Sequence, residues 1–98
     1  MSNLLMDYDP ASALIDSAAR AAFIKDAFES GEAGHAAAAI GVAIKAFGIQ
    51  AMAETVGLTV QILEDGFRPG GNPDLRILMM VLGALSVELS VSPRQSLI

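Results

Sequence analysis

Hydrophobic side chains recur three and four residues apart through most of this chain of 98 residues. Such spacing is typical of helices that bury one face. It predicts five helices, over about residues 17–29, 33–47, 50–56, 60–67 and 74–85. Boundary residues support these limits: Asp16 or Ser17 as the first N-cap, Gly31 and Gly48 at helix ends, and Asn72 as the last N-cap ahead of Pro73. The pattern therefore predicts an all-α protein.

The three longer helices each carry an apolar stripe that we expect to face the core. The stripe consists of Phe23, Ile24, Ala27 and Phe28 in the helix at 17–29, and of Ala36, Ile40, Ala43, Ile44 and Phe47 in the helix at 33–47. In the helix at 74–85 it consists of Leu75, Leu78, Met79, Leu82 and Leu85. Arg20 falls at the same spacing in the first helix but is expected to lie outside the core. Val42 lies on another face of the second helix, which predicts that this helix is buried on more than one side.

The pattern changes after the last helix. In residues 86–91, Val87, Leu89 and Val91 alternate with polar side chains. Alternation of this kind predicts a short β-strand.

The two ends carry weaker signals than the middle. Residues 1–15 are expected to be a lead-in, in which Tyr8-Asp9-Pro10 forms a turn or extended stretch because Pro10 disfavours a helical Asp9. Residues 92–98 are expected to be a loose tail. The length suits one domain spanning 1–98.

Composition adds two expectations about partners. Hydrophobic residues make up 53% of the chain and the mean hydropathy is +0.51, so surplus apolar surface predicts a homodimer. Six basic and eleven acidic residues give a net charge of -5, which suits a basic protein partner. The same sign opposes non-specific attraction to nucleic acid over the whole surface.

Targeting signals are not evident. The first ten residues, MSNLLMDYDP, show no basic stretch followed by a long apolar run, so no secretory signal is expected. The longest apolar stretch, at 36–44, is far shorter than the roughly 20 residues that span a bilayer. Together with the lack of cysteine, this predicts a soluble, cytoplasmic protein without membrane contact.

Catalytic and metal chemistry finds little support. His35 is the single histidine and is expected to be a surface or capping residue. Asp7 and Asp9 provide two carboxylates, fewer oxygens than a metal site usually needs. Gly70-Gly71 neither follows a strand nor precedes a lysine, so it is not a phosphate loop. We therefore expect no enzyme activity, no metal and no cofactor.

The most informative stretch is GIQAMAETVGLTVQILED, at 48–65, which has the layout of a helix-turn-helix. Ala53 is small enough for a close helix crossing, and Gly57, four residues later, permits the positive φ that the turn requires. Leu58 is then expected to plug the core, Thr59 to cap the second helix and Leu63 to anchor it inward. The same spacing is compatible with an ordinary αα-corner.

Three segments extend this interpretation to nearly the whole chain. DYDPASALIDSAARAAFIKDAFESG, IKAFGIQAMAETVGLT and GGNPDLRILMMVLGALSVELSV resemble, in order and spacing, the HigA-like addiction-module antidote (antitoxin) proteins of bacteria. The resemblance covers about residues 7–91. It implies a five-helix, lambda-repressor-like domain with a phage-repressor-type helix-turn-helix and a short C-terminal β-strand. It also implies dimerisation, binding to an operator near its own gene, and neutralisation of a toxin encoded alongside.

If the resemblance holds, the helix beginning at Thr59 enters the major groove of DNA. The candidate DNA contacts are Gln50, Thr59, Val60, Gln61, Glu64 and Arg68, with Arg76 as a further nearby cation. Gln61 is expected to pair with adenine and Val60 to touch a thymine methyl group, while Thr59 and Gln50 hold phosphates. Each of these side chains is also compatible with a solvated surface position.

The chain departs from this family at the surface that would meet DNA. Relatives usually carry basic or aromatic polar residues where this chain has Val60, Glu64 and Asp65. Acidic groups weaken attraction to phosphates, although Glu64 can accept a hydrogen bond from cytosine. Apolar residues also stand where relatives tend to be polar or charged, at Val42, Phe47, Ile77, Met80 and Gly83. These changes indicate either an enlarged protein interface or drift within a buried face.

Two hypotheses therefore remain open. The first is an operator-binding antitoxin or small regulator that acts as a homodimer. The second is a protein-interaction module that keeps the fold but binds DNA weakly or not at all, with the strand at 86–91 as an edge for a toxin or a second subunit.

Overall fold

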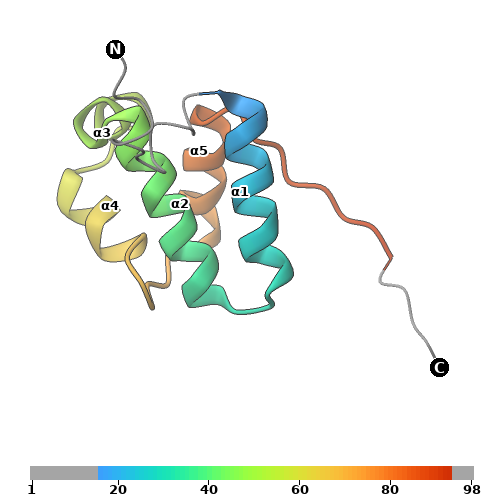
Figure 1. Cartoon of the computed structure of the whole chain (residues 1–98). Coiled ribbons are helices and arrows are strands. Elements are labelled where there is room, and N and C mark those ends of the chain that lie inside the picture. The colour runs from blue at the N-terminus through green and yellow to red at the C-terminus, as the bar shows by residue number, and fades with distance from the viewer. Residues whose placement is uncertain (1–15, 94–98) are drawn as a thin grey trace, which may run out of the picture.

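The computed structural model describes residues 16–93 and shows a bundle of helices (Figure 1). In chain order the elements are α1 (Ser17–Glu29), α2 (Ala33–Phe47), α3 (Ile49–Val56), α4 (Val60–Gly66) and α5 (Leu75–Ala84). The expected all-α class and the approximate limits of all five helices are confirmed. The lead-in predicted for residues 1–15, with Tyr8-Asp9-Pro10, and the tail beyond 93 lie outside the described residues.

Local sequence signals fix the first helix boundaries. Asp16 caps α1, its carboxylate accepting a hydrogen bond from the Ala19 N–H at 3.2 Å. Gly48 lies between α2 and α3 with φ of 108°, and its N–H donates to the Ile44 carbonyl at 2.8 Å. This left-handed backbone suits glycine, and α3 leaves α2 at an angle of 100°.

The start of α5 differs from the prediction. Asp74 rather than Asn72 is the N-cap, and its carboxylate accepts from the Ile77 N–H at 2.8 Å. Pro73 therefore precedes the cap instead of occupying the first helical position. Asn and Asp cap helices about equally well, so the sequence does not decide between Asn72 and Asp74 as the N-cap. The packing of the loop decides it.

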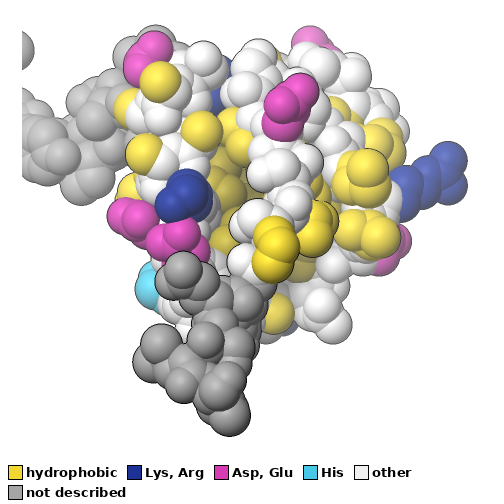
Figure 2. Space-filling view, turned by 90° about the vertical axis from the view of Figure 1, so that its right-hand side faces the viewer, with side chains coloured by type: hydrophobic (Ala, Val, Ile, Leu, Met, Phe, Trp, Pro, Cys, Tyr) yellow, Lys and Arg dark blue, Asp and Glu magenta, His cyan; other side chains and the backbone are white. Residues whose placement is uncertain are grey.

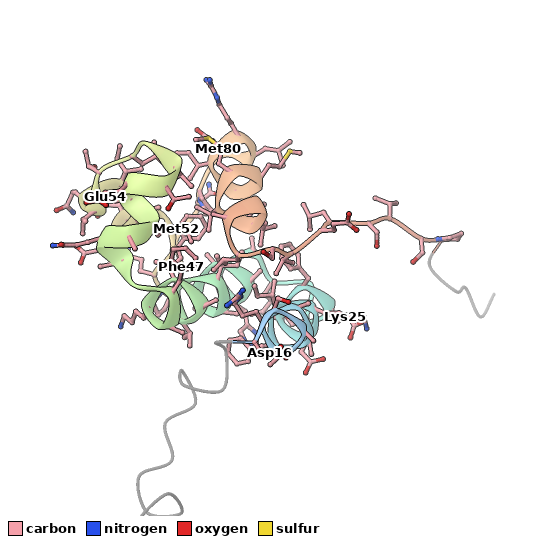
Figure 3. All side chains as sticks on the ribbon, turned by 90° about the horizontal axis from the view of Figure 1, so that it is seen from above. Asp16, Lys25, Phe47, Met52, Glu54 and Met80 are labelled. Carbon is pink, nitrogen blue, oxygen red and sulfur yellow. The ribbon has the colours of Figure 1, made fainter. Side chains whose placement is uncertain are left out.

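The core lies where α2 meets the other helices. Its buried members are Ile24, Ile40, Ala43, Ile44, Met52, Ala53, Leu63, Phe67, Val81, Leu82 and Leu85. On α2, Ala36, Ala37 and Ala39 are buried as well, which confirms that this helix is covered on more than one side. Figure 3 shows the Met52 side chain pointing from α3 toward the other helices.

Five side chains expected in the core are instead exposed. Phe23, Phe28 and Phe47 are between 36% and 40% exposed, and Leu75 and Met79 reach 65% and 58%. These assignments were wrong because the apolar residues of α1, α2 and α5 are not confined to one narrow stripe, so periodicity alone does not fix which side turns inward. The structure turns α5 so that Val81 is buried and Leu75 and Met79 face out.

Arg20 connects the first helix to the last. Its Nε donates a hydrogen bond to the Leu85 carbonyl at 3.0 Å, and the side chain is half-buried. The positive charge of Arg20 also interacts favourably with the negative, C-terminal end of the α5 helix dipole. Arg20 therefore helps to hold α1 against the end of α5.

The strand predicted over residues 86–91 is not formed. Within residues 16–93 the structure contains no strand, and after α5 the chain runs away from the helices (Figure 1). A strand needs a neighbour for its backbone hydrogen bonds, and the described part of the chain places none beside that segment.

The turn after α5 places a non-glycine residue in left-handed conformation. Ser86 has φ of 62°, and the Val87 N–H donates to the Leu82 carbonyl at 2.9 Å, as in a Schellman C-cap. Glycine usually occupies this position because a Cβ costs about 1 kcal/mol there.

Replacing Ser86 with glycine should therefore stabilise the fold. We expect Ser86→Gly to raise the free energy of unfolding by roughly 0.5–1 kcal/mol, measured by urea denaturation. Ser86→Ala keeps the Cβ and is the matched control, so it should bring no such gain. An equal effect of the two substitutions would contradict the strain at this turn.

Candidate functional site

Helices α3 and α4 meet at a tight glycine turn. Gly57 has φ of 72°, and both its N–H and the Leu58 N–H donate to the Ala53 carbonyl. Thr59 is extended and caps α4, its Oγ1 accepting from the Ile62 N–H at 3.1 Å. The turn at Gly57 and the cap at Thr59 are confirmed, and together they set the angle at which α4 leaves α3.

The inward sides of this helix pair are sealed. Ala53 on α3 is 7% exposed and Leu63 on α4 is 1% exposed, which confirms Leu63 as the inward anchor and places Ala53 in the core. Leu58 is half-buried and packs against the edge of the core, in agreement with its predicted role. The other sides of α4 are consequently turned outward.

A second glycine positions α4 from across the core. A Cβ on Gly41, in the middle of α2, would overlap the Phe67 carbonyl oxygen. The absence of that Cβ lets α2 approach the end of α4 closely. The sequence analysis missed this contact, although a glycine within an apolar helical pattern is the signal of such an approach.

The double glycine of the following loop has a similar packing role. Gly70 has φ of 78°, and a Cβ on Gly71 would overlap the Gly66 carbonyl oxygen at the end of α4. A Cβ on Gly34 would lie 2.9 Å from the Gly70 Cα. The loop therefore folds tightly between α4 and the start of α2.

Most of the predicted DNA contacts lie at the surface. Gln50, Thr59, Gln61, Glu64 and Arg68 are exposed, whereas Val60 is half-buried against the core. Ile62, which the sequence analysis did not single out, is 41% exposed on α4. The exposure of Ile62 follows from the inward position of Leu63, because neighbouring helical residues point in different directions.

Hydrogen bonds tie three of the polar residues into one cluster. The Gln61 amide nitrogen donates to the Asp65 carboxylate at 3.0 Å, one helical turn away. Arg68 Nε donates to the Asp65 carbonyl at 3.3 Å. The Gln61 donor is thus engaged within α4. Arg76, the other predicted cation, lies on α5, which packs on α3 and not on α4.

A groove of about 370 Å³ lies between α2 and α4. Its walls include Val42, Ile44, Ile49, Leu63 and Phe67, and its charged side chains are Lys45, Glu64 and Arg68. Lys45 is a further residue that the sequence analysis did not assign to this surface. The groove therefore brings two cations, Lys45 and Arg68, to one side of α4, where the carboxylate of Glu64 also lies.

Carboxylates surround the same helix pair. Glu54 lies on the outer side of α3 (Figure 3), and Glu64 and Asp65 are exposed on α4. On α1, the 2.7 Å contact with Glu29 holds the pKa of Lys25 above its ordinary value, so this cation is matched by an anion. The face around α4 therefore combines two helices joined by a tight glycine turn with several exposed carboxylates.

Sites for metals are not assembled in the part of the chain that the structure covers. No group of three or more His, Cys, Asp or Glu side chains could hold a metal ion among residues 16–93. His35 is exposed near the start of α2, and Asp7 and Asp9 lie outside the described range. No single described helix is long and apolar enough to cross a membrane; α2 and α3 meet the length and hydropathy requirement only as a bent pair.

Comparison with known proteins gives one match. Residues 4–93 match the model of a family described as probable addiction module antidote protein. The match spans all five helices and the segment that follows them. No curated protein and no solved structure matches the chain.

Proposed function

The chain belongs to the probable addiction module antidote family, and we propose that it is the antitoxin of a type II toxin–antitoxin module. In this role it binds and neutralises a partner toxin encoded beside it. As a homodimer it also binds an operator near its own gene, with α3 and α4 as a lambda-repressor-like helix-turn-helix. Both activities depend on binding and require no catalytic group.

The arrangement of α3, Gly57 and α4 carries the DNA-binding part of the proposal. Leu63 anchors α4 in the core, while Gln61, Ile62 and Asp65 remain outside. A helix held in this way can enter a major groove with its outer side chains toward the base edges. Two copies would then read half-sites about 34 Å apart.

The exposed side chains of α4 suggest how the bases would be read. Gln61 must exchange its bond to Asp65 for adenine, since a bidentate contact uses both ends of the amide. Ile62 is better placed than the half-buried Val60 to meet a thymine methyl group. Lys45 and Arg68, on the groove beside α4, are the cations closest to the expected phosphates.

Salt-dependent binding to the DNA upstream of the gene tests this function. Two cations in each subunit give four in a dimer, so the slope of log K against log salt should be about -4. Fluorescence anisotropy with the upstream fragment and a scrambled fragment measures both the slope and the specificity. Equal affinity for the two fragments would reject operator binding.

Removing one acidic group from α4 should strengthen binding to DNA. A carboxylate facing phosphates across several ångströms of water costs about 0.5–1 kcal/mol, so Glu64→Gln should tighten binding roughly threefold at low salt. Asp26→Asn, at an exposed position of α1, which has no contact with α4, removes the same charge elsewhere and should change affinity less. Weaker binding by Glu64→Gln would instead indicate that Glu64 contacts a base.

The charges around α4 favour a second candidate function. Glu54, Glu64 and Asp65 suit a basic protein better than a phosphate backbone, and Gln61 is already bonded within the helix. The chain would then be a protein-interaction module that retains the fold and binds the toxin through this surface. Tight binding of a purified toxin, lost on Glu64→Lys, together with no operator binding would support it.

A further inference from the structure

The segment after α5 carries apolar side chains that are exposed in the structure of residues 16–93. Val87 is half-buried and packs against the core, but Leu89 and Val91 are 49% and 98% exposed. Residues 87–93, hereafter the C-terminal segment, run away from the helices (Figure 1). Alternating apolar residues on an extended backbone are typical of a strand that lacks its neighbour.

The outer side of α5 continues this surface. Leu75, Met79 and Gly83 are four residues apart, so they lie on one stripe of the helix. Leu75 and Met79 are exposed, and a Cβ on Gly83 would meet no atom within 4 Å. Figure 2, which views the side with α1 and the C-terminal segment, shows several hydrophobic patches on this side together with charged side chains.

The distribution of charge indicates which partner fits this surface. The C-terminal segment carries one charged residue, Glu88, and the α5 stripe carries none. Asp74 caps the start of α5, but most of the other described acidic groups, which would attract a basic toxin, lie on α1, α3 and α4. A nearly neutral apolar strand is best matched by another of the same kind, and a second copy of the chain supplies one with the same alternation.

We propose that the C-terminal segments of two copies pair as antiparallel strands around a two-fold axis at Ser90. The proposal deepens the homodimer of the proposed function by assigning its interface. The partner strand runs from the tip of the segment back toward the body, where the exposed stripe of α5 covers its end. Gly83 leaves room there for the approaching backbone.

The register follows from three residues of the segment. An axis at Ser90 sets Leu89 opposite Val91 of the partner, which buries two apolar pairs, and sets Glu88 opposite a serine. An axis at Glu88 would instead place two carboxylates face to face. An axis at Leu89 would require Val87, which already packs against its own core. Ser90 is therefore the centre that satisfies both packing and charge.

A cysteine cross-link tests the register, since the chain contains no cysteine of its own. Residues on the axis have Cα atoms about 4.5–5.5 Å apart, within the range of a disulfide. Ser90→Cys should therefore form a covalent dimer under mild oxidation. Ser92→Cys is the matched control, because its two copies would be separated by about 13 Å along the strands. Equal cross-linking of the two variants would overturn the register.

Loss of the apolar pairs tests the interface itself. By analytical ultracentrifugation the wild-type chain should be a dimer, and Leu89→Asn with Val91→Asn should weaken dimerisation at least tenfold. Both side chains are exposed, so circular dichroism should show an unchanged helix content. Ser92→Asn is the control and should remain dimeric.

The outcomes separate this inference from the proposed function. A double variant that remains dimeric would overturn the interface while leaving the homodimer and its operator binding intact. A monomeric wild-type chain would overturn both the interface and the dimer. A double variant that dimerises normally but no longer binds toxin would overturn the assignment in favour of the toxin as occupant.

Discussion

Replacing Gly41 with alanine should destabilise the fold by about 3 kcal/mol. The added Cβ would overlap the Phe67 carbonyl oxygen, which is a backbone atom and cannot turn aside as a side chain does. Either α2 or the end of α4 must shift, and interiors packed at crystal density absorb such shifts poorly. Urea denaturation monitored by circular dichroism would measure the loss.

Gly83→Ala is the matched control for this substitution. Both glycines lie inside helices, but a Cβ on Gly83 would meet nothing within 4 Å. Both substitutions are compared in the Leu89→Asn, Val91→Asn background, which lacks the proposed dimer contact at Gly83. Alanine gains helix propensity there, so Gly83→Ala should raise the free energy of unfolding by up to about 1 kcal/mol. The same chemical change is thus expected to have opposite signs at the two sites. A neutral Gly41→Ala would show that α2 and α4 are less tightly packed than the structure indicates.

The displacement should also reach the proposed DNA-binding surface. Phe67 directly follows α4, and its buried ring forms part of the core. Movement of this residue changes the direction of α4 relative to α3. We therefore expect folded Gly41→Ala protein to bind the operator more weakly than its remaining stability alone would explain.

Features decided by nearby residues could be predicted from the sequence. The caps at Asp16 and Thr59 each involve an N–H three residues away, and the turn at Gly57 returns to Ala53 within the same helix. Glycine and capping side chains leave few alternative conformations at these points. The five helices and the shape of the candidate site follow from such local signals.

Features decided by distant residues were missed. The side of α5 that faces inward is set by its packing on α3 and by the hydrogen bond from Arg20 to the Leu85 carbonyl. Because α5 is apolar around most of its circumference, the sequence pattern did not show which side this would be. The exposure of Leu75 and Met79 is the result. The contact between Gly41 and Phe67 likewise joins residues that are far apart in the chain, and the spacing of neither reveals it.

The predicted strand shows a third kind of limit. The alternation of Val87, Leu89 and Val91 is present in the sequence, but a strand also requires a neighbouring backbone. No segment among residues 16–93 pairs with it, so the pattern records a preference that this part of the chain does not satisfy. The base contact of Gln61 remains a prediction; the structure adds that its amide donates to Asp65 in the single chain.

Truncating Leu63 should have an effect of similar size to Gly41→Ala. Leu63 is 1% exposed and is the side chain that anchors α4 in the core. Leucine-to-alanine substitutions at buried sites cost about 2–5 kcal/mol, a large share of the roughly 5–15 kcal/mol that holds a small domain together. We expect Leu63→Ala to lower the midpoint of thermal unfolding strongly, and at 37 °C to leave a substantial unfolded fraction.

Its neighbour Ile62 separates the structural role of α4 from its binding role. Ile62 is 41% exposed, so Ile62→Ala should cost no more than about 1 kcal/mol of stability. If α4 contacts a partner, however, the lost methylene groups should weaken binding by about 1–2 kcal/mol, or five- to thirtyfold. Measuring the affinity for the operator and for the toxin with the same variant shows which partner α4 meets. Unchanged affinity for both would mean that the outer side of α4 is not an interface, although its anchor at Leu63 still supports the fold.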